Sequence, residues 1–221
     1  MKKIMLTGGR PTGKLHLGHY IGAFKQYVKL QEDYKTFFII ADLHMLTTKS
    51  SKKDISTIHE NAINMVIDCI GMGIDPNKTT FYLQSNIPEL AYIFILIQNL
   101  INTSRIADTP SLLEMSKHAN MSELTLGLLT YPVLESGDIF SIRAEIVPVG
   151  KDNIDHVEIA KEIINTINQK YDAKFVIPQF ITGENNYVVG IDGSRKMSKS
   201  LDNAIYIRDT GQYFNAWVLF D

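Results

Sequence analysis

Apolar residues along this chain fall into two kinds of segment. Short, nearly unbroken apolar runs rich in β-branched and aromatic residues are typical of buried parallel strands, and they occupy residues 3–7, 36–41, 79–84 and 146–149. Longer segments with apolar residues at helical spacing predict helices at residues 17–32, 54–72 and 153–171. This alternation predicts an α/β fold with a doubly wound parallel sheet of the Rossmann type.

The stretch between the third and fourth predicted strands breaks this alternation. Helical spacing at residues 89–100, 111–117 and 123–141, the last with a kink near Pro132, predicts consecutive helices without an intervening strand. We therefore expect one Rossmann-type domain over residues 1–209 that carries a helical insertion at about 89–141. Residues 210–221 are mostly apolar or aromatic, lack a polar face, and form an atypical C-terminal tail in this interpretation.

A glycine-rich run directly follows the first predicted strand. It leads into His16 and His19, which are three residues apart and therefore share one face of a helical turn. A strand followed by a glycine-rich turn and a helix N-terminus presents backbone N–H groups to phosphate. The run has the glycine spacing of a Walker loop, but Leu15 stands where that loop needs a hydroxyl that binds Mg²⁺. On its own, the run favours a simple turn with surface histidines.

A second candidate lies near the other end of the chain, where Lys-Met-Ser-Lys-Ser occupies residues 196–200. Two ammonium groups so close together suit the negative charge that grows on a polyphosphate leaving group. Few apolar residues anchor the segment 190–203, so we expect its order to depend on a bound nucleotide. Together, the two runs predict a nucleoside-triphosphate site that is closed from two sides.

Polar residues also follow the other predicted strands. Asp42 and His44 follow the second strand, Gln84 follows the third, and residues 150–153 follow the fourth. Each of these alone is more typical of a cap or a turn. Because the carboxyl ends of parallel strands meet in one crevice, their combination predicts a ligand site there.

The two runs resemble the HIGH and KMSKS signatures of class I aminoacyl-tRNA synthetases, here as His16-Leu17-Gly18-His19 and Lys196 to Ser200. The blocks at residues 41–47, 84–89, 127–132, 138–139 and 147–152 resemble the tryptophanyl-tRNA synthetases in particular, and the resemblance covers residues 3–209. It implies a HUP-like Rossmann catalytic domain that activates L-tryptophan with ATP to tryptophanyl-adenylate and transfers it to tRNA(Trp). It also implies Mg²⁺ carried by the ATP phosphates and a homodimer.

The resemblance also implies roles for the matching residues. The implied catalytic residues hold phosphate oxygens and neutralise pyrophosphate, and they are His16, His19, Lys196 and Lys199. ATP binding is implied for Gly9, Arg10, Pro11, Thr12, Gly18, His19, Gly150, Lys151, Asp152, Val188, Lys196, Met197, Ser198, Lys199 and Ser200. Binding of the amino acid is implied for Leu6, His44, Tyr131, Glu135, Asp138, Val147, Val149 and Asn153. Four residues depart from the better-known bacterial pattern, namely Leu6, Arg10, Glu135 and Asn153 in place of an aromatic residue, Gln, Met and Gln.

Asp138 is the sharpest single candidate. It lies among apolar residues of a predicted helix, where a carboxylate is costly unless it is paired. A purely structural interpretation pairs it with Arg105, Arg143 or a backbone N–H. The resemblance implies instead that Asp138 accepts a hydrogen bond from the indole N–H of tryptophan. We favour this functional interpretation, because a site built for that donor rejects analogues that lack it.

Composition is that of an ordinary globular protein, with 45% hydrophobic and 21% charged residues. The net charge of −2 provides no basic field for nucleic acid, so any RNA contact has to be local. Cys69 is the single cysteine, which excludes an internal disulfide and argues against a cysteine-based metal site. No apolar run has membrane-spanning length, and we expect a cytoplasmic protein with no membrane partner.

Members of the family continue beyond KMSKS into a helical domain that reads the anticodon, and we interpret that domain as absent from this chain. We therefore expect the chain to activate tryptophan but to charge tRNA poorly. One alternative is a synthetase-like protein that binds nucleotide or amino acid without full aminoacylation, against which the retained histidines and lysines argue. Another is a nucleotidyltransferase of the same superfamily, against which the block around Asp138 argues.

Overall fold

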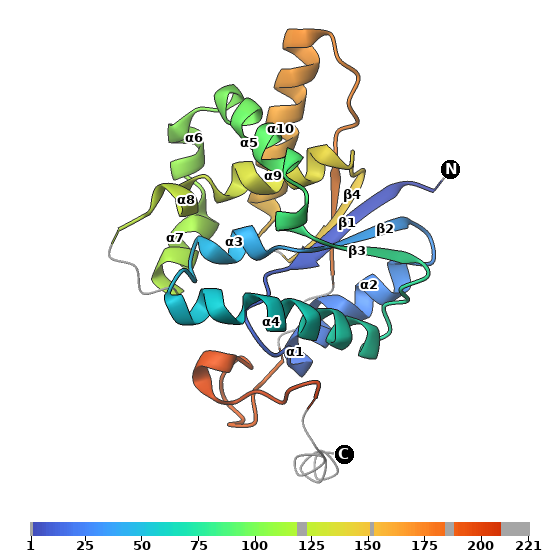
Figure 1. Ribbon diagram of the computed structural model, residues 1–221, viewed down its shortest axis with the longest axis vertical. Helices are drawn as coiled ribbons and strands as arrows, with labels where there is room; N and C mark the ends of the chain where they lie inside the picture. Colours follow the sequence, from blue (N-terminus) through green and yellow to red (C-terminus); the bar gives the residue numbers. More distant parts are fainter. Residues whose placement is uncertain (1, 119–122, 151–152, 184–187, 209–221) are drawn as a thin grey trace.

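A five-stranded parallel sheet forms the centre of the protein (Figure 1). The computed structural model describes residues 2–118, 123–150, 153–183 and 188–208. The strand order is β3-β2-β1-β4-β5, with bounds β1 Ile4–Gly9, β2 Lys35–Ile40, β3 Thr79–Leu83, β4 Ile146–Val149 and β5 Gln179–Thr182. The predicted α/β class and the four predicted strands are confirmed, and β5 is an edge strand that the apolar pattern did not predict.

Helices cover both faces of the sheet, as a doubly wound fold requires. One face is covered by α1 Leu17–His19, η1 Tyr20–Phe24, α2 Lys25–Leu30 and α4 Lys52–Gly71, and the other by α9 Tyr131–Ser141 and α10 Ile154–Tyr171. Alternate side chains of β2 point to opposite faces. Phe38 packs on the first face with Met65 of α4, and Ile39 packs on the second with Val157 of α10.

The predicted continuous helix over residues 17–32 is wrong in one respect. Between α1 and α2 the chain forms the π-helical turn η1, and Gly22 lies at the middle of this turn. Such π-turns are frequent at functional sites. Here the turn directly follows the two histidines of the first signature.

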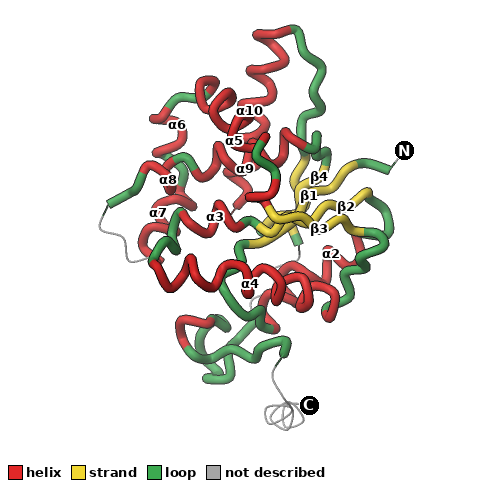
Figure 2. Tube along the Cα trace, in the orientation of Figure 1, coloured by secondary structure: helices red, strands yellow, loops and turns green. Residues whose placement is uncertain are grey.

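A group of helices occupies the chain between β3 and β4, where an insertion was predicted. Figure 2 shows that this stretch is predominantly helical. It contains η2 Gln84–Asn86, α5 Glu89–Ile97, η3 Gln98–Leu100, α6 Thr103–Ala107, α7 Pro110–His118, α8 Leu126–Leu129 and α9. Ile97, Leu112 and Leu128 from these helices share a core with Ile163 of α10. The helical stretch is therefore packed against the Rossmann part by apolar contacts.

The predicted single helix over residues 123–141 is wrong, because the chain forms α8 and α9 with a break at Thr130. Pro132 lies in the first turn of α9 instead of kinking a longer helix. Proline is favoured in the first turn of a helix because it has no N–H to donate, and the N–H groups of that turn have no partner inside the helix. The short helices α3 Asp42–Leu46 and α6 were not predicted either.

Residues 188–208 fold back onto the start of the chain, below α1 in Figure 1. The backbone N–H of Leu17 donates to Ile205 O at 2.8 Å, and that of Ile207 donates to Leu15 O at 3.0 Å. The Arg208 guanidinium also forms an ion pair with the buried Asp68 of α4. These contacts bring the C-terminal signature, which includes η5 Lys199–Leu201, beside the N-terminal one. Within the described residues, no helix combines the length and apolar character needed to cross a bilayer.

Candidate active site

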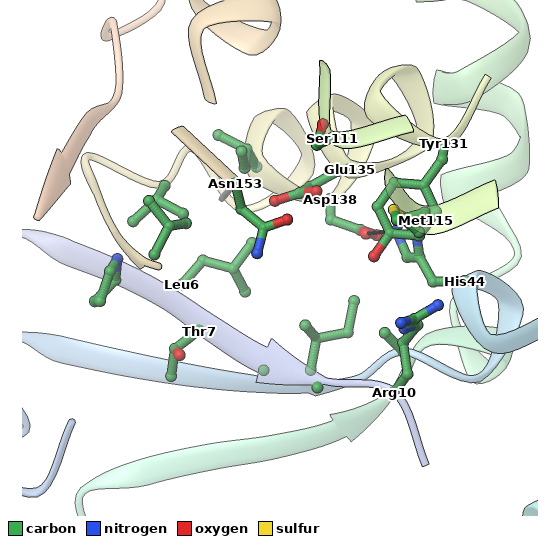
Figure 3. Close-up of a pocket in the computed structure, with 18 of the residues that line it drawn as sticks. Leu6, Thr7, Arg10, His44, Ser111, Met115, Tyr131, Glu135, Asp138 and Asn153 are labelled. Carbon is green, nitrogen blue, oxygen red and sulfur yellow. Dashed lines mark hydrogen bonds and ion pairs between the residues drawn. The ribbon is translucent and has the colours of Figure 1, made fainter. Parts of the chain in front are cut away.

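A cavity of about 680 Å³ opens where β1 and β4 end beneath α9. Its lining includes every residue to which the sequence assigned amino-acid binding: Leu6, His44, Tyr131, Glu135, Asp138, Val147, Val149 and Asn153. Figure 3 shows Glu135 and Asp138 on one wall, Leu6 of β1 across from them, and the Asn153 side chain between Glu135 and Leu6. The sheet thus brings together residues that are up to 147 positions apart in the sequence (6 to 153).

Asp138 is 3% exposed, and its carboxylate is hydrogen-bonded to two side chains that follow neighbouring strands. His44 Nε2 lies 2.9 Å from Asp138 Oδ2, and Gln84 Nε2 donates to both carboxylate oxygens at 3.0 and 3.1 Å. Burial raises the pKa of Asp138, against the opposing effects of His44 and Gln84. The carboxylate is therefore fixed in orientation at the cavity wall.

The partners suggested for Asp138 from the sequence are wrong. Arg105 instead forms a bidentate hydrogen bond with Glu162 of α10, and Arg143 lies over the Phe175 ring at 5.5 Å. The true partners follow β2 and β3, whose carboxyl ends meet under α9. Gln84 had been singled out only as a strand-end residue, and His44 both as a strand-end residue and as one implied to bind the amino acid. Neither argument predicted their contact with Asp138.

Glu135 lies one helical turn before Asp138 and also faces the cavity. Its Oε2 lies 2.8 Å from His156 Nδ1, and His156 Nε2 lies 2.7 Å from Ser111 Oγ. Burial raises the pKa of Glu135, but the charge and hydrogen bond of His156 outweigh that effect, and the pKa lies below its usual range. Glu135 therefore stays ionised at neutral pH.

Arg10 enters the cavity from the end of β1 (Figure 3). Its Nη1 donates to Thr48 Oγ1 at 3.0 Å, and its Cζ lies 6.0 Å from the centroid of the Tyr131 ring. Further lining residues that the sequence did not suggest are Thr48, Lys49, Ser111, Glu114 and Met115. Thr48 and Lys49 lie in a polar run that is typical of a solvent-exposed loop. The pattern of apolar and polar residues therefore did not indicate that they line a cavity.

The two signature histidines form one compact unit. The backbone N–H of His16 donates to His19 Nδ1 at 3.0 Å, and the two ring centroids are 3.7 Å apart. Burial, followed by the charges of Lys199 and Lys196, lowers the pKa of His16 to about 4. Burial, followed by His16 and Lys199, lowers the pKa of His19 to about 3. Both imidazoles are therefore neutral at pH 7 and able to donate a hydrogen bond without carrying charge.

Four cations converge between the histidines and the cavity. Burial lowers the pKa of Lys199, and the charges of Lys49 and Arg10 lower it further. Lys196 acts in the same direction on both histidines. In the described part of the chain, none of these four side chains forms an ion pair. Mutual repulsion of this kind is relieved by a polyanion.

The second signature is braced more firmly than the sequence indicated. Met197 is 4% exposed, and its N–H donates to Val188 O at 2.8 Å. Asn203 Oδ1 accepts from the Ser198 N–H at 2.8 Å. Met197 is thus one apolar anchor in a segment where few were expected, and it also lies beside Gly18.

Most of the other residues assigned to ATP lie outside the cavity lining. Gly9 does line it, but Pro11, Thr12, Gly18, Gly150, Val188, Lys196, Met197, Ser198 and Lys199 do not. The side chain of Ser200 lies outside the described part of the structure. Gly150 accepts from the Asn153 N–H at 3.0 Å in the turn after β4. Lys151 and Asp152 lie outside the described residues. The structure thus divides the assigned residues between the cavity and a cationic surface next to it.

A doubly wound parallel sheet, a histidine pair at the first strand–helix turn and a lysine pair folded against it define a class I aminoacyl-tRNA synthetase fold. The chain belongs to the tRNA synthetases class I (W and Y), the family of the tryptophan and tyrosine enzymes, whose model matches residues 2–218.

Comparison with individual proteins points to the tryptophan branch. The chain is 48% identical to tryptophan–tRNA ligases of Borreliella burgdorferi and Chlamydia caviae, over 94% of this chain and 60% and 61% of those proteins. A crystal structure of the Campylobacter jejuni tryptophanyl-tRNA synthetase complexed with ADP and tryptophan superposes with a TM-score of 0.86 at 35% identity, over 98% of this chain and 66% of that one. An Archaeoglobus fulgidus tyrosyl-tRNA synthetase, at 20% identity and a TM-score of 0.80, shares the fold. The chain spans about 60% of the length of the curated relatives it matches.

Proposed function

We propose that this chain carries the activation site of a tryptophan–tRNA ligase, which forms tryptophanyl-adenylate from L-tryptophan and ATP for transfer to tRNA(Trp). One observation carries the proposal: a cavity lined by a buried, oriented carboxylate adjoins a cluster of cations without ion-pair partners in the described structure, together with two neutral histidines. An aromatic amino acid suits the first part, and a triphosphate suits the second. Family membership and the tryptophan-specific relatives support this combination.

Asp138 is proposed to read the indole N–H. His44 and Gln84 donate to its oxygens, and Asp138 lines the cavity together with His44 (Figure 3). A buried acceptor that meets a hydrocarbon loses its hydrogen bond and bears the cost of desolvation. The cavity therefore discriminates against phenylalanine by leaving Asp138 short of a donor.

The cationic side is proposed to bind ATP. The carboxylate oxygen of tryptophan attacks the α-phosphorus in line, a new P–O bond forms, and the bond to the bridging oxygen of pyrophosphate breaks. His16 and His19 donate hydrogen bonds to phosphate oxygens, and Lys196 and Lys199 neutralise the departing pyrophosphate. Gly9 to Thr12, Gly18, residues 150–152 and residues 188 and 196–200 are proposed to shape the remaining nucleotide site.

Mg²⁺ is proposed to enter on the phosphate oxygens of ATP. The described side chains around the proposed polyphosphate position are ammonium, guanidinium and imidazole groups, which suit phosphate oxygens, whereas Mg²⁺ prefers oxygen ligands such as those of the phosphates themselves. When bound, Mg²⁺ would supply further charge neutralisation of the triphosphate.

A homodimer is also proposed. On α5, the residues Tyr92, Ile95 and Leu96 are 70%, 55% and 69% exposed and occupy one helical face at i, i+3 and i+4 spacing. An exposed aromatic and aliphatic face of this kind is typical of a protein interface. Sedimentation velocity of the wild type and of Leu96→Glu distinguishes a dimer from a monomer.

Tryptophan-dependent exchange of labelled pyrophosphate into ATP tests the proposed function. The protein should support exchange with tryptophan and show little with tyrosine or phenylalanine at equal concentration. Exchange that does not depend on an added amino acid, or that prefers tyrosine, would contradict the assignment. Thermal unfolding with and without ATP confirms that an inactive sample is nevertheless folded.

A further inference from the structure

Asp68 is a buried carboxylate that the proposed chemistry does not use. It lies on α4, is 2% exposed and does not line the cavity. Its Oδ2 accepts a long hydrogen bond, 3.4 Å, from the backbone N–H of Leu15, and its Oδ1 forms an ion pair with Arg208 Nε at 2.5 Å. A buried carboxylate is costly unless its oxygens are paired. These two partners therefore account for a charge at this depth.

The two partners of Asp68 belong to the two signature regions. Leu15 immediately precedes the histidine signature, and Arg208 follows the lysine signature in the segment 188–208. Figure 1 shows this segment below α1 and α4. Arg208 Nη1 also donates to Asn64 Oδ1 of α4 at 2.9 Å, so the guanidinium contacts the helix at two residues one turn apart. One helix thus holds both signature regions.

The pair with Asp68 is distinctive among the charges of the segment 188–208. Arg195 forms an ion pair with Asp192, which belongs to the same segment. Of the ion pairs in the described structure, only that of Arg208 joins this segment to another element. The remaining link to the histidine signature consists of backbone hydrogen bonds, such as that from Leu17 N–H to Ile205 O at 2.8 Å. Loss of the Arg208 ion pair would leave those backbone bonds without a side-chain brace.

The charge of Asp68 also acts on the lysine signature. Lys49 and Arg10 lower the pKa of Lys199, whereas Asp68 raises it. The carboxylate therefore lies near enough to favour the charged form of Lys199 against the surrounding cations. Its position suits a group that keeps this cationic segment in place before a polyanion binds.

On the basis of the proposed function, we infer that Asp68 and Arg208 are positioning residues that hold the lysine signature against the histidine signature during the reaction of ATP. Neither side chain lines the cavity, so the pair acts through the segment 188–208 and not by contact with the amino acid. Small displacements of charge-stabilising groups are costly to the rate, because their effect depends on being placed in advance. Releasing one anchor also raises the population of open states of the segment.

Kinetics of Arg208→Gln in tryptophan-dependent pyrophosphate exchange test this inference. The variant should lower kcat about tenfold, while the affinity for tryptophan, measured by calorimetry without ATP, should change less than about twofold. Arg208→Lys retains the positive charge and should recover most of the rate. Arg105→Gln is the matched control, because it removes an arginine from an ion pair with Glu162 that involves neither signature. This control should keep the wild-type kcat.

A double variant separates a loss of position from a folding defect. Arg208→Gln leaves Asp68 buried and unpaired, whereas Asp68→Asn combined with Arg208→Gln removes both charges. The double variant should melt at or above the temperature of the single one yet remain about as slow, because the two residues act as a unit. A double variant that regains the wild-type kcat, or an Arg208→Gln protein as active as Arg105→Gln, would overturn the inference and leave the proposed function standing.

Hydrogen-exchange mass spectrometry without ATP provides a readout that does not depend on activity. In Arg208→Gln and in the double variant, the segment 188–208 should exchange about fivefold faster or more, while exchange in α10 stays unchanged. Unaltered exchange in this segment would also overturn the inference. A wild-type protein without tryptophan-dependent pyrophosphate exchange would overturn the proposed function instead, and the hydrogen exchange would still show whether the pair holds the segment.

Discussion

Asp138 shows how one buried residue can set selectivity. The carboxylate lies between His44 and Gln84, which fix its orientation but leave it at the cavity wall. Because burial raises its pKa, Asp138 gains from any ligand N–H that stabilises its charge. In the proposed function the indole N–H is this donor, and Leu6 and Val147, which line the same cavity, would contact the rest of the ring.

Asp138→Asn should therefore weaken tryptophan binding by about 1.5–3 kcal/mol, the range for a hydrogen bond to a charged group. The amide is similar in size, but its NH₂ end cannot accept the indole hydrogen. Calorimetry with tryptophan gives the loss, and titration with ATP in the absence of amino acid is the control. Equal losses for both ligands would mean that Asp138 supports the fold instead of reading the substrate.

The signature histidines predict a pH dependence of stability. Their pKa values lie at about 4 and about 3, below the ordinary value of 6.5 that applies to the unfolded chain. Between pH 6.5 and about 4 the unfolded state therefore binds more protons, and stability falls as the pH falls. Above pH 6.5 the histidines contribute no such slope.

Chemical denaturation of the wild type and of a His16→Asn, His19→Asn double variant over pH 4 to 8 measures this contribution. The free energy of unfolding of the variant should fall less steeply below pH 6.5. Identical slopes would show that the imidazoles are not neutral in the folded protein.

At this scale, the sequence identified residue types better than their contacts. The residues assigned to the amino acid all line one cavity. They could be predicted as a group because the resemblance to the family implied all of them at once. The contact between His44 and Asp138 joins positions 94 residues apart, and that between Glu135 and His156 joins two different helices. Such contacts depend on the packing of α9 over the sheet, which a pattern of apolar residues does not specify.

Among the elements, the turn from β1 into α1 places the histidines. Gly18 is required there for close packing, because a Cβ atom at this position would lie 2.9 Å from the His16 ring and 3.6 Å from Met197 Cβ. Gly22, in the π-helical turn η1, has open space at the same position. Gly18 and Gly22 therefore form a matched pair for substitution, because only Gly18 has a close neighbour at the Cβ position.

Gly18→Ala should lower kcat/KM for ATP about tenfold or more, which corresponds to about 1.4 kcal/mol of transition-state stabilisation. The added methyl group displaces the His16 ring, whereas Gly22→Ala gains helix propensity without a clash and should retain the wild-type rate. Steady-state pyrophosphate exchange measures both variants. A Gly18→Ala protein as active as Gly22→Ala would show that the close contact is unimportant.

The elements that the sequence predicted share a strong local signal. Four strands were found because their apolar runs are continuous, and α4 and α10 because their helical spacing extends over many residues. The strand β5 has four residues and none is fully buried, so its pairing with β4 is a tertiary effect. Pro132 was predicted to kink one long helix, but it lies in the first turn of α9. The two cases differ only in whether the helix continues through the residues just before the proline.

Across the whole molecule, the C-terminal segment completes the site by docking on the N-terminal one. Residues 205–208 hydrogen-bond to the backbone beside His16, and Arg208 reaches α4. Between these anchors and Val188, the lysine signature is held by Met197 and Asn203 while its two ammonium groups remain without ion-pair partners in the described structure. A bound polyphosphate therefore adds contacts that the segment lacks on its own.

ATP should slow amide hydrogen exchange in the segment 190–203 by about tenfold or more at the least protected sites, because each added contact lowers the population of open states. The helix α10 provides the internal control, since it forms the far side of the core and its protection should change little. Hydrogen-exchange mass spectrometry resolves both regions in one sample. Exchange in 190–203 that is insensitive to ATP would contradict a segment that closes on the nucleotide.

A single-turnover reaction with ATP labelled at the α-phosphorus decides whether the site forms an aminoacyl-adenylate. Excess protein mixed with labelled ATP, Mg²⁺ and tryptophan should convert the label to tryptophanyl-adenylate, with none formed from tyrosine. Lys199→Ala should form the same product roughly a hundredfold to a thousandfold more slowly, because the leaving pyrophosphate loses one of the two lysines proposed to neutralise it. Label that stays in ATP, that appears as AMP regardless of the amino acid, or that is transferred at the wild-type rate by Lys199→Ala would contradict the proposed chemistry.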